Sequence, residues 1–142
     1  MTTIPESVTE LRVRYAETDQ MGVVYHTNYL IWCEIARTDL IRTLGASYRD
    51  LEARGVRLAV SEASVRYIAA ARYDDRIRVE TRLTRVTSRT MHFEYTILNA
   101  DSLQRLATAS TTLISLDPAN RVAVLPPDVR RALSGHSTTD GS

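Results

Sequence analysis

Hydrophobic and polar residues alternate one by one along much of the chain, which is the two-residue period of a half-buried strand. Leu11, Val13 and Tyr15 follow this period, and they predict a first strand that ends near Tyr15. The period returns in residues 76–83 and 91–97, which favours antiparallel strands with one buried face. The whole stretch from residue 56 to about residue 116 is therefore predicted to be a strand meander, with turns near residues 70–75, 87–89, 99–102 and 117–120.

Three other segments carry helical patterns. Residues 28–44 are apolar around most of the circumference of a helix, which is typical of a buried helix, and Gly45 follows where such a helix would end. A second, short helix is predicted over residues 47–54. Residues 128–133 come directly after two prolines and predict one or two further helical turns.

These elements predict an α+β fold in a single domain that spans residues 1–133. One long central helix is wrapped by an antiparallel sheet of about five strands, because no other element is available to cover it. This arrangement is called the hotdog fold. The polar residues 134–142 are predicted to form a disordered tail.

Composition and charge narrow the possible functions. The chain is 44% hydrophobic and 25% charged, close to the average for globular proteins. Its 18 basic residues are all arginine, and 17 acidic residues balance them to a net charge of +1, so we expect no nucleic-acid partner. Arginines concentrated in residues 72–89 form either a local anion-binding patch or a solvated strand face.

Cysteine and hydropathy bear on the compartment. Cys33 is the only cysteine, so no intramolecular disulfide is available and a cytoplasmic location is expected. No apolar run approaches the length of a membrane span, and none is predicted. Three histidines and one cysteine without ligand spacing predict no metal site.

The chemistry is concentrated in residues 15–29. Asp19 places a carboxylate in a predicted loop, a few residues before the start of the long helix. The first N–H groups of a helix have no partner within it, and the helix dipole adds positive charge there, so they can hold an oxyanion. A carboxylate beside such amides suits acyl transfer, in which one oxyanion donor contributes about 3–4 kcal/mol.

The pattern Asp19-x-x-Gly22-x-Val24-x-His26-x-x-Tyr29, followed by WCEIAR, resembles the 4-hydroxybenzoyl-CoA thioesterase family. Within that family it is most similar to the YbgC-like bacterial acyl-CoA thioesterases. Residues 67–75 and 88–93 resemble two further turn segments of the family, so the resemblance covers about residues 9–130. It implies a hotdog fold and hydrolysis of a small or medium, aliphatic or aryl acyl-CoA to free acid and CoA.

The resemblance also implies the roles of particular residues. Asp19 is the expected catalytic carboxylate, as a nucleophile that forms a mixed anhydride or as a general base that activates water. The backbone amide at His26 is expected to polarise the carbonyl, and the imidazole is a second candidate for orienting water or substrate. Substrate contacts are expected from Gly22, Val24, Tyr25, Tyr29, Arg72, Ser88, Arg89 and Thr90, of which the last four suit the CoA phosphates. No cofactor is expected, apart from coenzyme A as part of the substrate.

Other interpretations stay open at this point. A hotdog hydratase or dehydratase would act on the same thioesters, and a non-catalytic acyl-CoA-binding protein would need no reactive carboxylate. Glu34 and Arg37, three residues apart on one helix, are predicted to pair with each other or with a neighbouring subunit. Tyr29 and Trp32 are expected in the core or in the pocket wall. An exposed sheet edge predicts at least a homodimer, and the resemblance implies a homotetramer.

Overall fold

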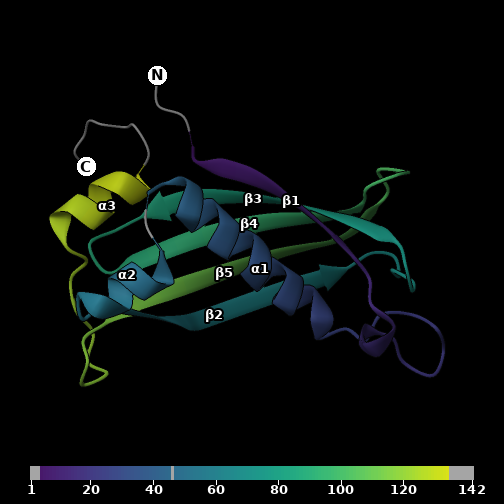
Figure 1. Cartoon of the computed structure of the whole chain (residues 1–142), viewed down its shortest axis with the longest axis horizontal. Helices are drawn as coiled ribbons and strands as arrows, with labels where there is room; N and C mark the ends of the chain where they lie inside the picture. Colours follow the sequence, from purple (N-terminus) through teal and green to yellow (C-terminus); the bar gives the residue numbers. More distant parts are fainter. Residues whose placement is uncertain (1–3, 46, 135–142) are drawn as a thin grey trace.

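The computed structural model describes residues 4–45 and 47–134, and Figure 1 shows how their elements are arranged. Five strands and three α-helices follow one another along this part of the chain, with one 3₁₀ turn near its start. In order they are β1 (Glu6–Arg12), the 3₁₀ turn η1 (Tyr15–Glu17), α1 (Asn28–Thr43), α2 (Tyr48–Ala53), β2 (Arg57–Tyr67), β3 (Arg76–Val86), β4 (Thr90–Asn99), β5 (Arg105–Leu116) and α3 (Pro127–Leu133).

The five strands form one antiparallel sheet in the order β1-β3-β4-β5-β2, and α1 lies across one of its faces (Figure 1). This confirms the predicted α+β fold with a central helix and about five strands. The predicted meander is correct only for β3, β4 and β5. After β2 the chain crosses the sheet, so β2 pairs with β5 and becomes an edge strand.

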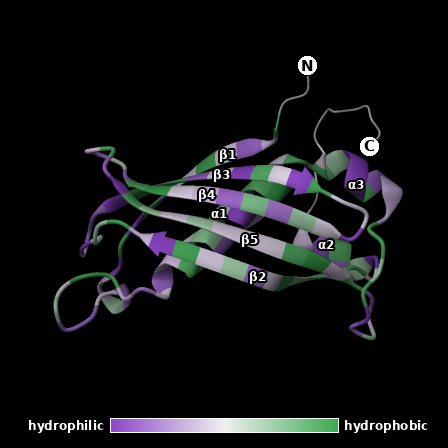
Figure 2. Cartoon of the chain, turned by 180° about the vertical axis from the view of Figure 1, so that it is seen from behind, coloured by the Kyte–Doolittle hydropathy of each residue, from purple (hydrophilic) through white to green (hydrophobic). Residues whose placement is uncertain are grey.

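The core lies between α1 and the sheet. One side of the helix is buried there, through Tyr29, Trp32, Cys33, Ala36, Arg37, Leu40 and Ile41. The other side is not, since Ile31 and Ile35 are each 44% exposed, so the helix is buried on one face rather than all round. Figure 2 shows the sheet from behind, where hydrophilic and hydrophobic residues alternate along the strands as their period predicts.

The helical segments were predicted well and the first strand was not. Ser47 caps α2 by accepting a hydrogen bond from the backbone N–H of Asp50, and α3 has a proline in its first turn. Strand β1 ends at Arg12 instead of near Tyr15, because η1 turns the chain out of the sheet and leaves Tyr15 77% exposed. The predicted tail, residues 134–142, lies outside the described residues except for Ser134 at the end of α3.

The predicted pairing of Glu34 with Arg37 is wrong within the chain, because the Arg37 guanidinium binds two buried or half-buried tyrosine hydroxyls instead. Arg37 is buried, and it donates from Nε to the Tyr48 hydroxyl at 3.0 Å and from Nη1 to the Tyr95 hydroxyl at 3.3 Å. Glu34 is exposed, and Arg37 forms no ion pair with any described residue. Tyr29 and Trp32 are buried, which confirms their expected place in the core.

None of the described helices is long and apolar enough to cross a bilayer.

Candidate active site

The segment between β1 and α1 folds into a small hairpin that holds Asp19 near its tip. The N–H of Tyr25 donates to the carbonyl of Glu17 at 2.9 Å, and the N–H of Asp19 donates to the carbonyl of Val23 at 2.8 Å. The tip closes with a bond from the N–H of Gly22 to the carbonyl of Asp19 at 3.0 Å. Gly22 has a φ of 81°, which strains any residue with a side chain, so this tight turn needs glycine.

One oxygen of the Asp19 carboxylate supports the turn. Oδ1 accepts hydrogen bonds from the N–H groups of Met21 at 2.8 Å and Val23 at 3.4 Å. Oδ2 accepts none from the part of the chain that the structure describes, and the side chain is exposed. The carboxylate is therefore held in place through one oxygen, while the other is available for chemistry.

The residues just before α1 carry free backbone amides. The N–H groups of His26 and Thr27 have no acceptor among residues 4–45 and 47–134. The carbonyl of His26 accepts a hydrogen bond from the hydroxyl of Tyr67, at the end of β2, at 2.9 Å. The imidazole of His26 is exposed and lies beside the rings of Tyr25 and Tyr67, with centroid distances of 4.5 Å and 6.1 Å. An acyl oxygen can therefore be met at this point by backbone amides alone.

The crossover between β2 and β3, residues 68–75, packs against this hairpin. The N–H of Val24 donates to the carbonyl of Ala71 at 2.9 Å, and Val23 forms a bridge with Arg72, which places Arg72 beside the hairpin. The N–H of Ala71 in turn donates to the Tyr29 hydroxyl at 3.0 Å. Burial raises the pKa of this phenol, so Tyr29 stays neutral, and its hydroxyl holds the backbone of the crossover in place.

The predicted substrate-binding residues do not all come together in one chain. Gly22, Val24, Tyr25, Tyr29 and Arg72 lie in or against the hairpin. Ser88 and Arg89 lie in the turn between β3 and β4, and Thr90 is the first residue of β4. The carbonyls of Ser88 and Arg89 accept from the N–H groups of Leu125 and Ser115. Strand β3 has 11 residues, so at about 3.3 Å per residue this turn lies roughly 30 Å from the hairpin.

Comparison with known proteins decides the family. Residues 13–133 match the profile of the thioesterase-like superfamily. The chain belongs to this superfamily. It is 35% identical to the acyl-CoA thioester hydrolase YbgC of Escherichia coli over 108 residues, which are 76% of this chain and 80% of that protein. It is 49% identical over 72 residues to the putative acyl-CoA thioesterase YneP of Bacillus subtilis, and this match spans about half of each protein, 51% and 52%.

Solved structures place the fold in the same superfamily. A DHNA-CoA thioesterase from Staphylococcus aureus superposes with a TM-score of 0.86 and 36% identity, over 91% of this chain and 89% of that one. The hypothetical protein TT1821 from Thermus thermophilus gives a TM-score of 0.84 and 41% identity, over 91% and 95% of the two chains. These matches confirm the predicted hotdog fold and the thioesterase resemblance.

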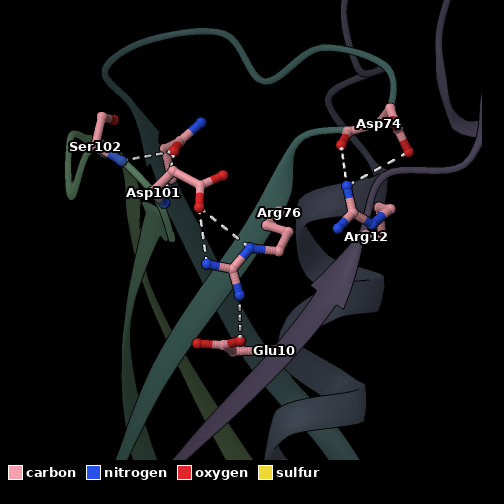
Figure 3. Close-up of polar contacts among 7 residues, drawn as sticks. Glu10, Arg12, Asp74, Arg76, Asp101 and Ser102 are labelled. Atoms are coloured by element: carbon pink, nitrogen blue, oxygen red, sulfur yellow. Dashed lines mark hydrogen bonds and ion pairs between the residues drawn. The ribbon is translucent and has the colours of Figure 1, made fainter.

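Figure 3 shows polar contacts at the end of the sheet where β1 ends and β3 begins. Arg76 at the start of β3 binds Glu10 on β1 at 3.0 Å and Asp101 in the turn between β4 and β5 at 2.8 Å. Arg76 also lowers the pKa of the Asp101 carboxyl. Arg12 donates to the carbonyl of Asp74 in the crossover at 2.9 Å. These contacts link β1, the crossover between β2 and β3, and the turn between β4 and β5.

Sequence reasoning missed two residues that build this site. Glu17, two positions before Asp19, is only 5% exposed, and its Oε2 accepts from the indole Nε1 of Trp32 at 3.1 Å. Tyr67 reaches the His26 carbonyl from the opposite edge of the sheet. Both contacts join residues far apart along the chain, and no local pattern marks either of them.

Proposed function

We propose that the chain hydrolyses the thioester bond of acyl-CoA, releasing the free acid and CoA, with Asp19 as the catalytic carboxylate. The observation that carries this proposal is that one short segment presents both a free carboxylate oxygen and a free backbone N–H group. Oδ2 of Asp19 accepts no hydrogen bond from the described residues, and the N–H of His26 donates to none. The similarity to YbgC, an acyl-CoA thioester hydrolase, and to YneP, a putative acyl-CoA thioesterase, supports the same reaction.

Two routes fit this arrangement. In the first, Oδ2 attacks the thioester carbon, the C–S bond breaks, and the leaving CoA thiolate takes up a proton. Water then hydrolyses the mixed anhydride and regenerates the Asp19 carboxylate. In the second, the carboxylate removes a proton from a water molecule that attacks the same carbon; the C–S bond then breaks, and the proton passes from Asp19 to the leaving CoA thiolate, which restores the carboxylate. In both routes the negative charge on the carbonyl oxygen develops beside the His26 amide.

The full site of this proposal is built from two copies of the chain. Strand β2 is an edge strand, and its Tyr67 end lies at the hairpin while its Arg57 end pairs with Leu116, near the turn 88–90. If two β2 strands pair antiparallel about a twofold axis, the Arg57 end of one copy lies beside the Tyr67 end of the other. This brings the turn 88–90 of the second copy towards the hairpin of the first, where Ser88, Arg89 and Thr90 can meet the CoA phosphates.

The homodimer is therefore the minimal unit of this proposal, and a homotetramer in the cytoplasm is the assembly we expect. The free edge of β2 supports the dimer, because the unpaired N–H and C=O groups of an edge strand can pair with a strand of a second chain. Sedimentation velocity of the purified protein measures the state directly. A monomer at all concentrations would refute the two-copy site.

Release of free CoA from a panel of short, medium, long and aromatic acyl-CoAs tests the reaction. Asp19→Asn keeps Oδ1 as the acceptor for Met21 and Val23, so the hairpin survives while the charge is lost. We expect its kcat to fall at least about a hundredfold. Asp50→Asn is the matched control, because the Asp50 carboxylate is exposed on α2 and makes no contact with a described side chain.

Three outcomes separate the possibilities. If the wild type releases no CoA from any member of the panel, the thioesterase proposal is wrong, and a hydrated or dehydrated acyl-CoA product would point to the hydratase alternative. If the wild type is active and Asp19→Asn is equally active, hydrolysis stands but Asp19 is not its catalytic carboxylate. Loss of activity in Asp50→Asn as well would mean that the loss in Asp19→Asn is not specific to Asp19, which would refute its role as the catalytic carboxylate.

A further inference from the structure

Glu17 is the only buried acidic side chain among the described residues. It is 5% exposed, whereas its neighbour Asp19 is exposed. A carboxylate in a buried position must be hydrogen-bonded, because an unpaired buried charge is strongly destabilising. The contacts of Glu17 therefore show what this part of the chain is organised around.

Each oxygen of the Glu17 carboxylate holds a different element. Oε1 accepts from the backbone N–H of Arg14, the residue before η1, at 2.8 Å. Oε2 accepts from the indole N–H of Trp32, in the second turn of α1, at 3.1 Å. The guanidinium of Arg14 is 3.5 Å from Oε2, but that side chain is 73% exposed and contributes little. The carboxylate thus fastens the start of the hairpin to the buried face of the helix.

The backbone carbonyl of Glu17 holds the other end of the hairpin. It accepts from the N–H of Tyr25 at 2.9 Å and from Nδ2 of Asn28, the first residue of α1, at 2.9 Å. The chain that leaves Glu17 and passes through Asp19 therefore returns to the same residue before it enters the helix. Glu17 therefore joins both ends of the segment that carries Asp19 and the free amides of His26 and Thr27.

We propose that Glu17 is a positioning residue, which sets the place of the Asp19 carboxylate against the amides that open α1. This inference rests on the proposed thioesterase function. It needs both carboxylate oxygens of Glu17 as acceptors, because each accepts from a different N–H donor. A glutamine at this position offers one oxygen and turns its NH₂ group towards the other donor, so one of the hydrogen bonds to the Arg14 N–H and the Trp32 indole is lost.

The first test is Glu17→Gln, with Glu52→Gln as the matched control on the exposed surface of α2. We expect kcat to fall about tenfold to a hundredfold while KM changes less than about twofold, because a displacement of about 1 Å costs this much in rate. Trp32 is the only tryptophan, so its single indole N–H resonance reports on the contact directly. The resonance should shift upfield in Glu17→Gln and stay unchanged in Glu52→Gln.

A double variant separates positioning from a general structural role. If Glu17 acts through Asp19, Glu17→Gln has no further effect on the residual rate of Asp19→Asn, because the group that it positions is already inactive. A loss by the same factor in both backgrounds would overturn the inference. So would a folded Glu17→Gln protein with the kcat of the wild type.

Asn28→Ala provides a second route if Glu17→Gln does not fold. Asn28 is half-buried, and the substitution removes the hydrogen bond from its Nδ2 to the Glu17 carbonyl. The carboxylate of Glu17 stays intact. We expect a smaller loss of kcat, about threefold to tenfold, again with KM nearly unchanged. An unchanged kcat in Asn28→Ala would overturn the inference. A wild type that releases no CoA would refute the thioesterase proposal instead, so the two failures are distinguishable.

Discussion

Tyr67→Phe removes one hydrogen bond that joins the edge of the sheet to the start of the long helix. The Tyr67 hydroxyl donates to the carbonyl of His26 at 2.9 Å, and the only other donor to that carbonyl among the described residues, the N–H of Tyr29, lies at 3.3 Å. Because a peptide unit is planar and trans, the N–H of Thr27 points opposite to the His26 carbonyl. Holding this carbonyl therefore also holds the free N–H of Thr27.

The expected magnitude follows from the kind of contact that is lost. A neutral hydrogen bond contributes about 0.5–1.5 kcal/mol, and Tyr67 is 46% exposed, so water can replace part of it. About 1 kcal/mol in the transition state corresponds to roughly a fivefold lower kcat. The same change in the free energy of unfolding lowers Tm by about 3 °C. The edge-on ring contact with Tyr29, at 5.2 Å, remains in phenylalanine.

The assay is steady-state release of CoA, with Tyr73→Phe as the control because Tyr73 is exposed and its hydroxyl has no described partner. Burial raises the pKa of the Tyr67 phenol, so the hydroxyl stays protonated. The ratio of wild-type to Tyr67→Phe rates should therefore be constant between about pH 6 and about pH 9. If kcat and KM of Tyr67→Phe stay within about twofold of the wild type, the orientation of the 26–27 peptide does not depend on Tyr67.

Two further predictions concern titrating side chains. Burial raises the pKa of the Cys33 thiol to about 12, so the native protein should resist iodoacetamide at about pH 8 and react only after unfolding, as read by mass spectrometry. Rapid native alkylation would contradict this burial. The side-chain hydrogen bonds from Arg54 lower the pKa of Asp128 from 3.8 to about 2. Because this pKa is lower in the folded protein, the ion pair stabilises the fold fully above the pKa of the unfolded chain, and this stability is lost as pH falls through the folded pKa. The Tm of the wild type should therefore exceed that of Asp128→Asn by less and less from about pH 4 to about pH 2. A constant difference in Tm over that range would show that Arg54 does not act through this charge.

Local periodicity was a reliable guide to the elements themselves. Strands β3 and β4 and the helix α1 lie where their patterns predicted, because the alternation of Ile77 and Val79, or of Phe93 and Tyr95, reports which face of each strand is buried. The resemblance of the segment around Asp19 likewise led to the correct superfamily. The error at β1 arose because Tyr15 continues the alternation after the chain has already turned into η1.

Tertiary structure decided which elements meet. The period of a strand says which side is buried but not which strand lies next to it, so the pairing of β2 with β5 was not predictable from the pattern. The separation of the turn 88–90 from the hairpin follows from that strand order and from the length of β3. The roles of Glu17, Arg37 and Tyr67 depend on partners 11 to 58 residues away, and only packing brings such partners within hydrogen-bond distance.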